Sequence, residues 1–410
     1  MRILVLAPDV PATSRMPGSP RLFNLCRELS RNHELFLFTR CSSRERYETF
    51  LGDATGPRVF SRVDLLPDPP SASWLGQQWH RMHLAAHFET RYRHAGYHRS
   101  ICQGVRDFCE SEHIDLVYAD LLAMSQYIDR RIGVPAIVDL HDSLTLLGRR
   151  ILGAEREWRG RLLAWLGLTS VARLERSLAR TFDLAITNSA VDEQVLRELC
   201  AELRTLTISN GVDMEYFLPD AVLPQADKIV FTGVMDYAPN EDAALYFSKE
   251  IFPLVRAQRP QAQFWIVGSN PSATLKGLAQ AGGIHVTGSV DDVRPYVRSA
   301  AVFVSPLRVG SGVKNKILAA MAMEKATVAT PLSIDGLDVA HGREVLLAQE
   351  PRLFADQVVR LMTDESERRR LGANGLACVR SKYSWRAMGE SLESALRSIA
   401  PPAPRRLAAA

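Results

Sequence analysis

"SPLRVGSGVKNKILAAMAME" (residues 305–324) joins the end of an apolar strand to a glycine turn, two lysines and an amphipathic helix. Glycines let the backbone approach a ligand closely, and the amides of a first helical turn point along the positive end of the helix dipole. Such a turn fits either a phosphate site or the plain start of a helix, and the basic side chains beside it favour a pyrophosphate. The candidate binding residues are Arg308, Gly310, Ser311, Gly312, Val313 and Lys314.

The familiar phosphate-binding motifs do not match this turn. The spacing G-x-x-x-x-G-K-[ST] is absent, and no G-x-G-x-x-G follows the first apolar run. A second glycine turn does follow that run, where Gly18 precedes a helix that begins near Pro20 and includes Arg21. It predicts either a second ligand contact or an ordinary strand-to-helix turn with proline in the first helical turn. If both turns bind, they hold opposite ends of one ligand.

Short apolar runs alternate with helix-length amphipathic stretches along the whole chain. This alternation predicts an α/β fold with two Rossmann-like, doubly wound parallel sheets. Ligands of such sheets bind beyond the carboxyl ends of the strands, so we expect the site in a cleft between two facing domains. The predicted strands are 2–7, 35–39, 114–120, 135–140, 183–189 and 205–209 in the first sheet, and 229–233, 263–268, 284–288, 301–306, 326–330 and 344–348 in the second.

A chain of 410 residues is longer than one ordinary hydrophobic core accommodates, so two domains are predicted. We place the first at 1–217 and the second at 229–383, where the strand pattern restarts. Between them, 218–228 has two prolines and no periodicity, as in a linker. Predicted helices of the second domain are 241–257, 291–299 and 312–323. A last helix, 384–398, is expected to pack back on the first domain.

The composition is that of a globular protein, with 46% hydrophobic and 23% charged residues. A net charge of +4, spread along the chain, gives no indication of a nucleic-acid partner. The first apolar run, 3–7, is too short for a signal peptide or a membrane span, so a cytoplasmic protein is expected. Five histidines between His80 and His98 fit either a metal site or the wall of an acceptor site, and without clustered carboxylates or thiolates the second is favoured.

One basic stretch stands out from this even distribution. Between Arg149 and Arg180 there are eight arginines and three glutamates, with Trp158 and Trp165 among several leucines. A basic helix with tryptophans can lie on the inner face of an anionic membrane as a peripheral contact. The other interpretation, which is favoured at this point, is a solvated helix whose arginine stems cover the core.

Four segments, taken together, resemble one known family. They are "NGVDMEYF" (210–217), "VFTGVMDYAPNEDA" (230–243), "VTGSVDDVRPYV" (286–297) and "PLRVGSGVKNKILAAMAMEKATVAT" (306–330). They resemble the retaining glycosyltransferases of family 4, and most of all bacterial sugar transferases associated with exopolysaccharide synthesis. The resemblance implies the GT-B fold, with a nucleotide-sugar donor on the C-terminal domain and the acceptor on the N-terminal one. It implies no metal or cofactor, because cations and a helix N-terminus neutralise the leaving diphosphate.

The resemblance also suggests roles for individual residues. The turn at 310–312 with Lys314 matches the segment that contacts the donor's phosphates and sugar, and Gly18 matches a loop that closes over the diphosphate. His141, after the strand 135–140, matches a position near the donor sugar and is the candidate catalytic residue. It could equally be a satisfied structural histidine. Arg21 and Asp142 are assigned to the acceptor side.

The chain departs from the family pattern at two glutamates, which are Ser311 and Ala319 here. The second glutamate normally accepts hydrogen bonds from the ribose hydroxyls, and its loss costs about 1.5–3 kcal/mol of donor binding. A basic pair is also replaced, by Met235 and Asn240, and we expect Lys316 with Arg308 and Lys314 to supply the charge.

Two functions fit these observations. One is an active, retaining hexosyltransferase of polysaccharide or glycoconjugate synthesis with a glycan, lipid-linked or small-molecule acceptor. The other is a non-catalytic GT-B subunit that binds a partner enzyme.

Overall fold

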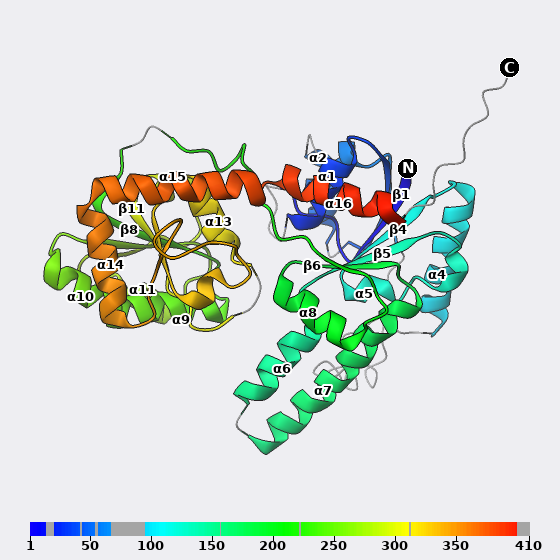
Figure 1. Ribbon diagram of the computed structural model, residues 1–410, viewed down its shortest axis with the longest axis horizontal. Coiled ribbons are helices and arrows are strands. Elements are labelled where there is room, and N and C mark those ends of the chain that lie inside the picture. Colours follow the sequence, from blue (N-terminus) through cyan, green and yellow to red (C-terminus); the bar gives the residue numbers. More distant parts are fainter. Residues whose placement is uncertain are drawn as a thin grey trace. The chain divides into compact units, whose positions relative to one another are not determined.

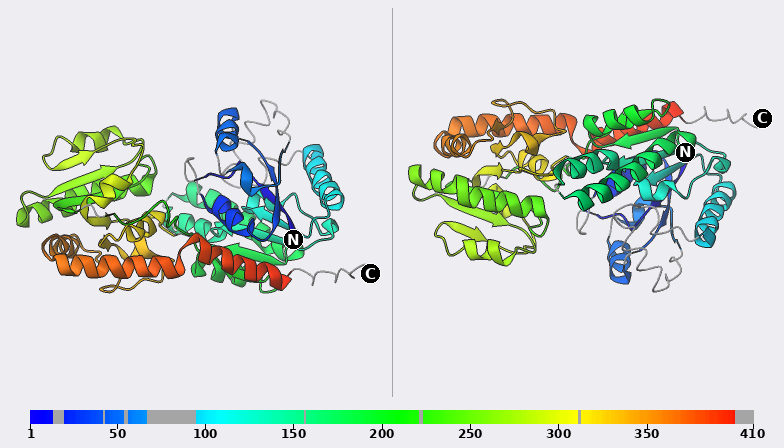
Figure 2. Two further views of the ribbon diagram at one scale, coloured as in Figure 1. Left: turned by 90° about the horizontal axis from the view of Figure 1, so that it is seen from above. Right: turned by 90° about the horizontal axis from the view of Figure 1, so that it is seen from below.

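The computed structural model describes residues 1–13, 20–41, 43–53, 56–66, 95–155, 157–220, 223–310 and 313–399 (Figure 1). The chain divides into two compact units. The first comprises Met1–Ser209 together with Met388–Ala410, and the second comprises Asn210–Ala387. Each unit is a parallel sheet with helices on both faces (Figure 2), as connections between parallel strands require.

The sheet of the first unit has the order β3-β2-β1-β4-β5-β6-β7. Its central strands are largely apolar because helices cover both faces, with polar residues such as Asp120, Asp139 and His141 toward their carboxyl ends. The chain reverses its direction of winding between β1 and β4, which makes the carboxyl ends of these strands the topological switch point. The strands are β1 Arg2–Ala7, β2 Glu34–Thr39, β3 Arg62–Leu65, β4 Leu116–Asp120, β5 Ala136–His141, β6 Leu184–Thr187 and β7 Thr205–Thr207, and the helices are α1 Arg21–Leu29, α2 Arg44–Gly52, α4 Ala95–Ser111, α5 Leu122–Ser125, α6 Leu144–Ala154, α7 Trp158–Ser177 and α8 Ala190–Leu199.

The sheet of the second unit has the order β10-β9-β8-β11-β12-β13, with its switch point between β8 and β11. One apolar cluster covers each face, the first built around Phe247 and Phe264 and the second around Phe303 and Met321. The strands are β8 Gln225–Thr232, β9 Gln263–Val267, β10 Ile284–Val286, β11 Ala300–Ser305, β12 Thr327–Ala329 and β13 Leu346–Leu347, and the helices are α9 Ala238–Tyr246, α10 Phe252–Gln258, α11 Ala273–Leu278, α12 Arg294–Arg298, α13 Asn315–Ala322, α14 Pro351–Thr363 and α15 Glu365–Lys382.

The carboxyl ends of β8 and β9 approach each other closely at a glycine. Gly268 has φ +149°, and a Cβ there would lie 1.7 Å from the carbonyl oxygen of Gly233. Only glycine fits this contact. It holds the loop after β8 against the loop after β9, beside the switch point.

The last helix, α16 (Trp385–Ile399), begins in the second unit, and its residues from Met388 onward belong to the first. There His33 binds Glu393, and Gly389 lies so close to Glu28 that a Cβ would collide with that side chain. The C-terminal part of α16 is therefore held on the first unit.

The α/β class with two parallel sheets, predicted from the sequence, is the observed one. The boundaries differ in places. β3 escaped prediction because its alternately charged residues form an edge strand that is only half-buried. β8 begins at Gln225, inside the predicted linker 218–228, and the units divide after Ser209.

Two predicted helices also differ from the observed ones. The helix predicted at 241–257 is interrupted by a π-helical turn, Phe247–Ile251, because Pro253 has no amide hydrogen to continue the α-helical pattern. The helix predicted at 312–323 begins at Asn315. Among the described helices, none combines the length and the apolar character needed to cross a bilayer.

Candidate functional site

A partly buried lysine lies at the switch point of the second unit. Lys316, in the first turn of α13, donates a hydrogen bond of 2.5 Å to Asn240 Oδ1, and its ammonium lies 4.2 Å from the centre of the Phe231 ring. Asn240 is oriented in turn, because its Nδ2 donates to the Val234 carbonyl at 2.9 Å. Elements far apart in sequence, β8, α9 and α13, thus meet around one cation. We call Phe231, Gly233, Asn240 and Lys316 the lysine cluster.

Gly233 makes room for this arrangement. A Cβ at Gly233 would lie 2.7 Å from Asn240 Nδ2 and 3.1 Å from Lys316 Nζ. A larger residue would therefore displace the amide or the ammonium. The glycine after β8 is a condition for the lysine cluster to form.

The charge of the lysine cluster is uncompensated. Desolvation, together with the positive charge of Lys314, lowers the pKa of Lys316 to about 7. No carboxylate in the described part of the chain forms an ion pair with Lys316, and the first turn of α13 has no acidic residue. A cation with a lowered pKa beside a helix N-terminus favours binding of an anion.

Sequence reasoning named Lys316 as a source of charge but left it out of the candidate site residues. The signal that could have placed it there is Asn240. An asparagine in the position of a basic residue removes a repulsion from Lys316 and supplies the oxygen that holds the ammonium.

The predicted glycine turn leads into the same helix. Gly310 has φ +131°, in the region that favours glycine, and a Cβ there would lie 3.8 Å from Lys314 Cε. Lys314 directly precedes α13, and Val313 is buried. Ser311 and Gly312, like Gly18, lie outside the described residues. The described part of the turn thus lies beside Lys314, two residues from Lys316.

Arg308 has a carboxylate partner. Its Nη2 and Nε lie 2.5 and 3.1 Å from the two oxygens of Asp242, and its guanidinium lies 4.3 Å from the centre of the Tyr246 ring. Arg308 also lines a hollow of about 380 Å³ beyond β11, β12 and β13, with Thr330 and Glu350. Its charge is already balanced, unlike that of Lys316.

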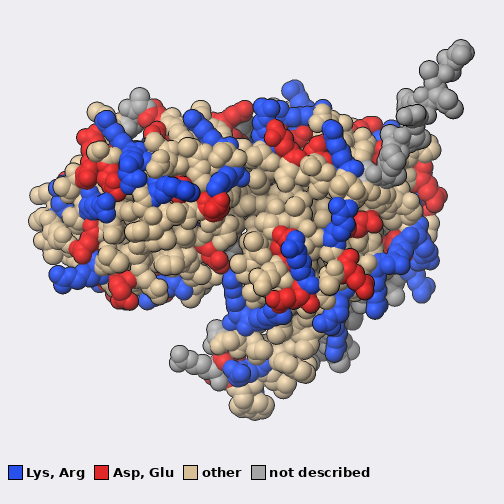
Figure 3. Space-filling view, in the orientation of Figure 1, with Lys and Arg blue, Asp and Glu red and all other residues tan. Residues whose placement is uncertain are grey.

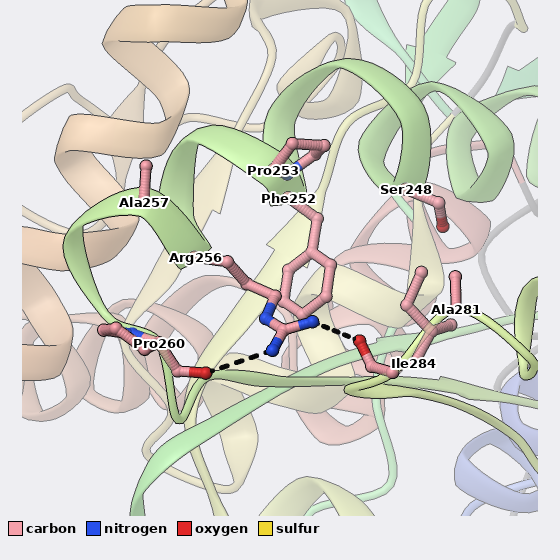
Figure 4. A pocket seen from close by; sticks show the side chains of 9 residues that line it. Ser248, Phe252, Pro253, Arg256, Ala257, Pro260, Ala281 and Ile284 are labelled. Atoms are coloured by element: carbon pink, nitrogen blue, oxygen red, sulfur yellow. Dashed lines mark hydrogen bonds between the residues drawn. The ribbon is translucent and has the colours of Figure 1, made fainter.

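A larger hollow, of about 470 Å³, lies on the second unit at the amino ends of β9 and β10 (Figure 4). Arg256 extends across it and donates to the carbonyls of Gly282 at 2.5 Å and Pro260 at 3.3 Å. This guanidinium already donates its hydrogen bonds to backbone carbonyls. The hollow lies at the amino ends of the strands, whereas the switch point lies at their carboxyl ends. It therefore does not belong to the candidate site.

In the first unit, the candidate catalytic residue His141 ends β5. Its Nε2 lies 2.9 Å from Asp120 Oδ1, and both His141 and Leu121, which follows Asp120, have positive φ (62° and 65°). Strained non-glycine residues of this kind gather at functional sites. Burial opposes the charged form of the imidazole, but Asp120 and Asp139 outweigh it and raise the pKa of His141.

Arg21, predicted on the acceptor side, lies in the core with 1% of its surface exposed. Its Nε donates to Asp139 at 2.8 Å, and its Nη1 donates to the carbonyl of Ile208 at 2.8 Å. Tyr118 donates to the same carboxylate at 2.6 Å. Burial opposes ionisation of Asp139, but Arg21 and its neighbours hold the carboxyl pKa below its usual value. Since Asp139 also accepts from the His141 amide at 3.2 Å, Arg21 positions the end of β5.

Three buried polar atoms lie at the carboxyl ends of β5, β6 and β7. They are Asp142 Oδ1, Asn188 Oδ1 and Ser209 Oγ, and none has a hydrogen-bond partner among the described residues. Asn188 is tied to His141, because its amide donates to the His141 carbonyl at 2.7 Å. Unsatisfied buried polar atoms are costly. Their position after the strands favours a polar ligand at the predicted acceptor residue Asp142.

Four histidines of the predicted histidine-rich segment, His80, His83, His87 and His94, lie outside the described residues. His98 is described, and its Nε2 lies 2.8 Å from the Gln126 carbonyl. Within the part of the chain that is described, no group of three or more histidine, cysteine, aspartate or glutamate residues could hold a metal ion.

Comparison with known proteins gives partial matches in sequence. Residues 226–364, inside the second unit, match the family model of the glycosyl transferases group 1. A stretch of 227 residues is 30% identical to the "GDP-mannose-dependent monoacylated alpha-(1-6)-phosphatidylinositol monomannoside mannosyltransferase" of Corynebacterium glutamicum, covering 47% of this chain and 55% of that protein. The "uncharacterized 44.6 kDa protein in cps region" of Klebsiella pneumoniae is 20% identical over 172 residues, 40% of this chain and 44% of that protein. The chain spans about half the length of the curated relatives it matches.

Solved structures match nearly the whole chain. The sucrose-phosphate synthase of Thermosynechococcus elongatus has a TM-score of 0.68 at 18% identity, covering 97% of this chain and 99% of that one. The HepE protein of Anabaena, in complex with UDP, has a TM-score of 0.64 at 16% identity, covering 97% and 100%. These likenesses confirm the expected GT-B fold class. The match of residues 226–364 to the glycosyl transferases group 1 agrees with the expected resemblance to glycosyltransferases and does not reach the finer assignment to family 4.

Replacing Arg21 tests whether the buried ion pair holds the end of β5. Arg21→Met leaves the Asp139 carboxylate buried without its main partner, and we expect a loss of about 3–5 kcal/mol in the free energy of unfolding, measured in urea. The control is Arg31→Met, two residues beyond the end of α1. Arg31 is exposed, and its ion pair with Glu28 contributes at most about 1 kcal/mol. Equal losses in the two variants would contradict the assignment.

Proposed function

We propose that the chain is a retaining, metal-independent glycosyltransferase of group 1. It moves a hexose from a nucleotide-diphosphate sugar to a glycan, lipid-linked or small-molecule acceptor, in the synthesis of a polysaccharide or glycoconjugate. The observation that carries this proposal is the lysine cluster at the switch point of the second unit. There the partly desolvated Lys316 ammonium, with no carboxylate partner among the described residues, stands at the start of α13.

The chemistry of sugar transfer needs such a site. Departure of a nucleoside diphosphate leaves positive charge on the sugar, in an oxocarbenium-like transition state, and negative charge on the leaving phosphates. Fixed donors in a desolvated site stabilise developing charge best, because they need no reorganisation during the reaction. Lys316 is such a donor, since Asn240 and Phe231 hold its ammonium in place.

The donor class is supported by two relatives. HepE was crystallised with UDP-glucose, and the Corynebacterium glutamicum relative is named for its dependence on GDP-mannose. Both ligands are nucleotide-diphosphate sugars. By analogy, we assign the diphosphate to the N-terminus of α13 with Lys314 and Lys316, while the base and the sugar stay open.

We assign the acceptor and the reacting face of the sugar to the first unit. With a raised pKa, His141 carries a proton on each nitrogen over a wider pH range, so its Nδ1 can donate to a sugar hydroxyl while Nε2 faces Asp120. Asp142 offers an oxygen without a protein partner among the described residues to an acceptor hydroxyl. Arg21 contributes by positioning β5 and does not need to touch substrate.

A non-catalytic subunit is the second candidate, because Ser311 and Ala319 replace two glutamates of the family pattern. Ala319 is partly exposed, between the buried Leu318 and Ala320, so a longer side chain has an outlet there. The lysines Lys314 and Lys316, which remain in this chain, favour an active enzyme over a non-catalytic subunit.

Removing the cation tests the diphosphate site. Lys316→Met keeps the length of the side chain and removes a charge-assisted hydrogen bond, so affinity for UDP, GDP and their sugars should fall by about tenfold to a hundredfold in calorimetry. Lys249→Met, at an exposed position of the same unit, should change affinity by less than about twofold. Loss of this partly buried charge is not expected to unfold the protein, which an unchanged thermal midpoint would verify.

Two outcomes count against the proposal. If Lys316→Met binds nucleotides as tightly as the unmodified protein, the phosphates do not bind at the lysine cluster. If the unmodified protein binds none of these nucleotides at millimolar concentration, the non-catalytic subunit becomes the better account.

Restoring the missing carboxylate tests the ribose pocket. Ala319→Glu should raise the affinity for a ribonucleoside diphosphate by about tenfold or more, because a carboxylate accepts hydrogen bonds from both ribose hydroxyls. The gain should be smaller for the 2′-deoxy analogue, which lacks one of them. Ala273→Glu, exposed at the start of α11, adds the same charge elsewhere and should give no gain. Equal gains for both nucleotides would show that Ala319 does not face the ribose.

A further inference from the structure

The helices α6 and α7 form a hairpin that projects from the first unit (Figure 1). The two helices pack tightly on each other, since a Cβ at Gly148 would lie 3.1 Å from Leu168 Cδ1. We call residues 144–177 the helical hairpin. Its far end, between Ala154 and Trp158, lies away from the sheet (Figure 1), and large apolar side chains of both helices are exposed there.

The outer surface of the helical hairpin is unusually apolar. On α7, Trp158, Leu162, Trp165 and Leu166 follow the spacing i, i+4, i+7, i+8, which places them on one face. Their exposed fractions are 70%, 50%, 51% and 42%. The buried residues Gly167 and Glu175 lie on the opposite face of the helix. We call the four exposed residues the apolar stripe. A continuous apolar face of this kind marks an interaction site, unlike single exposed apolar residues.

Cations surround the apolar stripe. Arg159 and Arg161 flank it on either side in the helical projection, and Arg159 lies 5.2 Å from the centre of the Trp158 ring. Farther along the same face, Arg173 and Arg176 are exposed. Glu175, one of the three glutamates between Arg149 and Arg180, is buried and cannot offset them at the surface. Figure 3 shows a largely tan hairpin end with Lys and Arg side chains, and fewer acidic ones, beside it.

The base of the helical hairpin is fixed beside His141. The buried carboxylate of Glu175 accepts hydrogen bonds from the Leu144 amide at 2.8 Å and the Ser143 hydroxyl at 3.1 Å, so α7 caps the start of α6. The Ser143 amide in turn donates to Asp192 at 2.8 Å. Because Ser143 follows His141 by two residues, these hydrogen bonds hold the base of the helical hairpin at the carboxyl end of β5.

We propose that the helical hairpin docks on a membrane surface containing anionic phospholipid. Tryptophan and leucine on one face with arginines along its borders suit the boundary between headgroups and acyl chains, where the apolar residues insert and the arginines meet phosphates. The positive border favours an anionic surface over a second copy of this chain, because two copies would bring like charges together. This inference does not depend on the proposed transferase activity.

Vesicle flotation of the full chain tests the proposal. The protein should float with vesicles of phosphatidylglycerol and phosphatidylcholine and bind pure phosphatidylcholine at least about tenfold more weakly, with binding that falls as salt rises. Leu162→Ser with Trp165→Ser, and separately Arg159→Glu with Arg161→Glu, should each lower the bound fraction by about tenfold or more. Trp158→Phe with Trp165→Phe should keep binding and abolish the blue shift of tryptophan emission.

Matched controls lie on α14, where Leu353→Ser and Arg352→Glu change exposed residues of the same kinds and should leave flotation unchanged. Light scattering of the same variants shows whether they remain folded and whether their mass changes. The proposal is overturned if the unmodified protein does not float, or if the hairpin variants float as well as it does. It is also overturned if those variants instead dissolve a dimer, because the apolar stripe is then an interface between copies.

Discussion

One hydrogen bond, from the Lys316 ammonium to Asn240 at a partly buried position, holds the candidate site together. The bond keeps a cation at the switch point that no carboxylate of the described chain neutralises. Around it, the glycine after β8 leaves space, Gly268 fixes the loop beside it, and α13 adds the positive end of its dipole. A ligand with a diphosphate would complete this arrangement.

Much of this arrangement follows from sequence alone, and the reasons for the gaps are physical. Parallel strands buried on both faces are continuous apolar runs, so the strands of both sheets except β3 were predictable. The edge strand β3 is alternately charged, and the break at Phe247–Ile251 depends on one proline, so neither shows in periodicity. The partner of Lys316 lies 76 residues away. A local sequence pattern does not indicate a contact between residues so far apart in the chain.

The difference between local sequence pattern and tertiary contact also applies to His141 and Arg21, two predicted site residues of the first unit. His141 is recognisable as a polar residue after a buried strand, and the structure adds its carboxylate partner and its strained backbone. Arg21 is recognisable as a cation at the start of a helix after a glycine turn, but the structure shows it buried in the core and paired with Asp139, where it supports the site and does not line it. Whether such a residue positions the site or contacts the ligand depends on its burial, and burial is set by the tertiary structure.

Proton linkage during donor binding tests the central claim most directly. Calorimetry of UDP-glucose and GDP-mannose in buffers of different ionisation enthalpy reports protons taken up with the ligand. A Lys316 pKa near 7 in the free protein leaves the amine mostly neutral near pH 8, and a bound diphosphate raises that pKa, so close to one proton should be taken up there and much less near pH 6. Binding near pH 8 without proton uptake would contradict a role for Lys316 in neutralising the diphosphate.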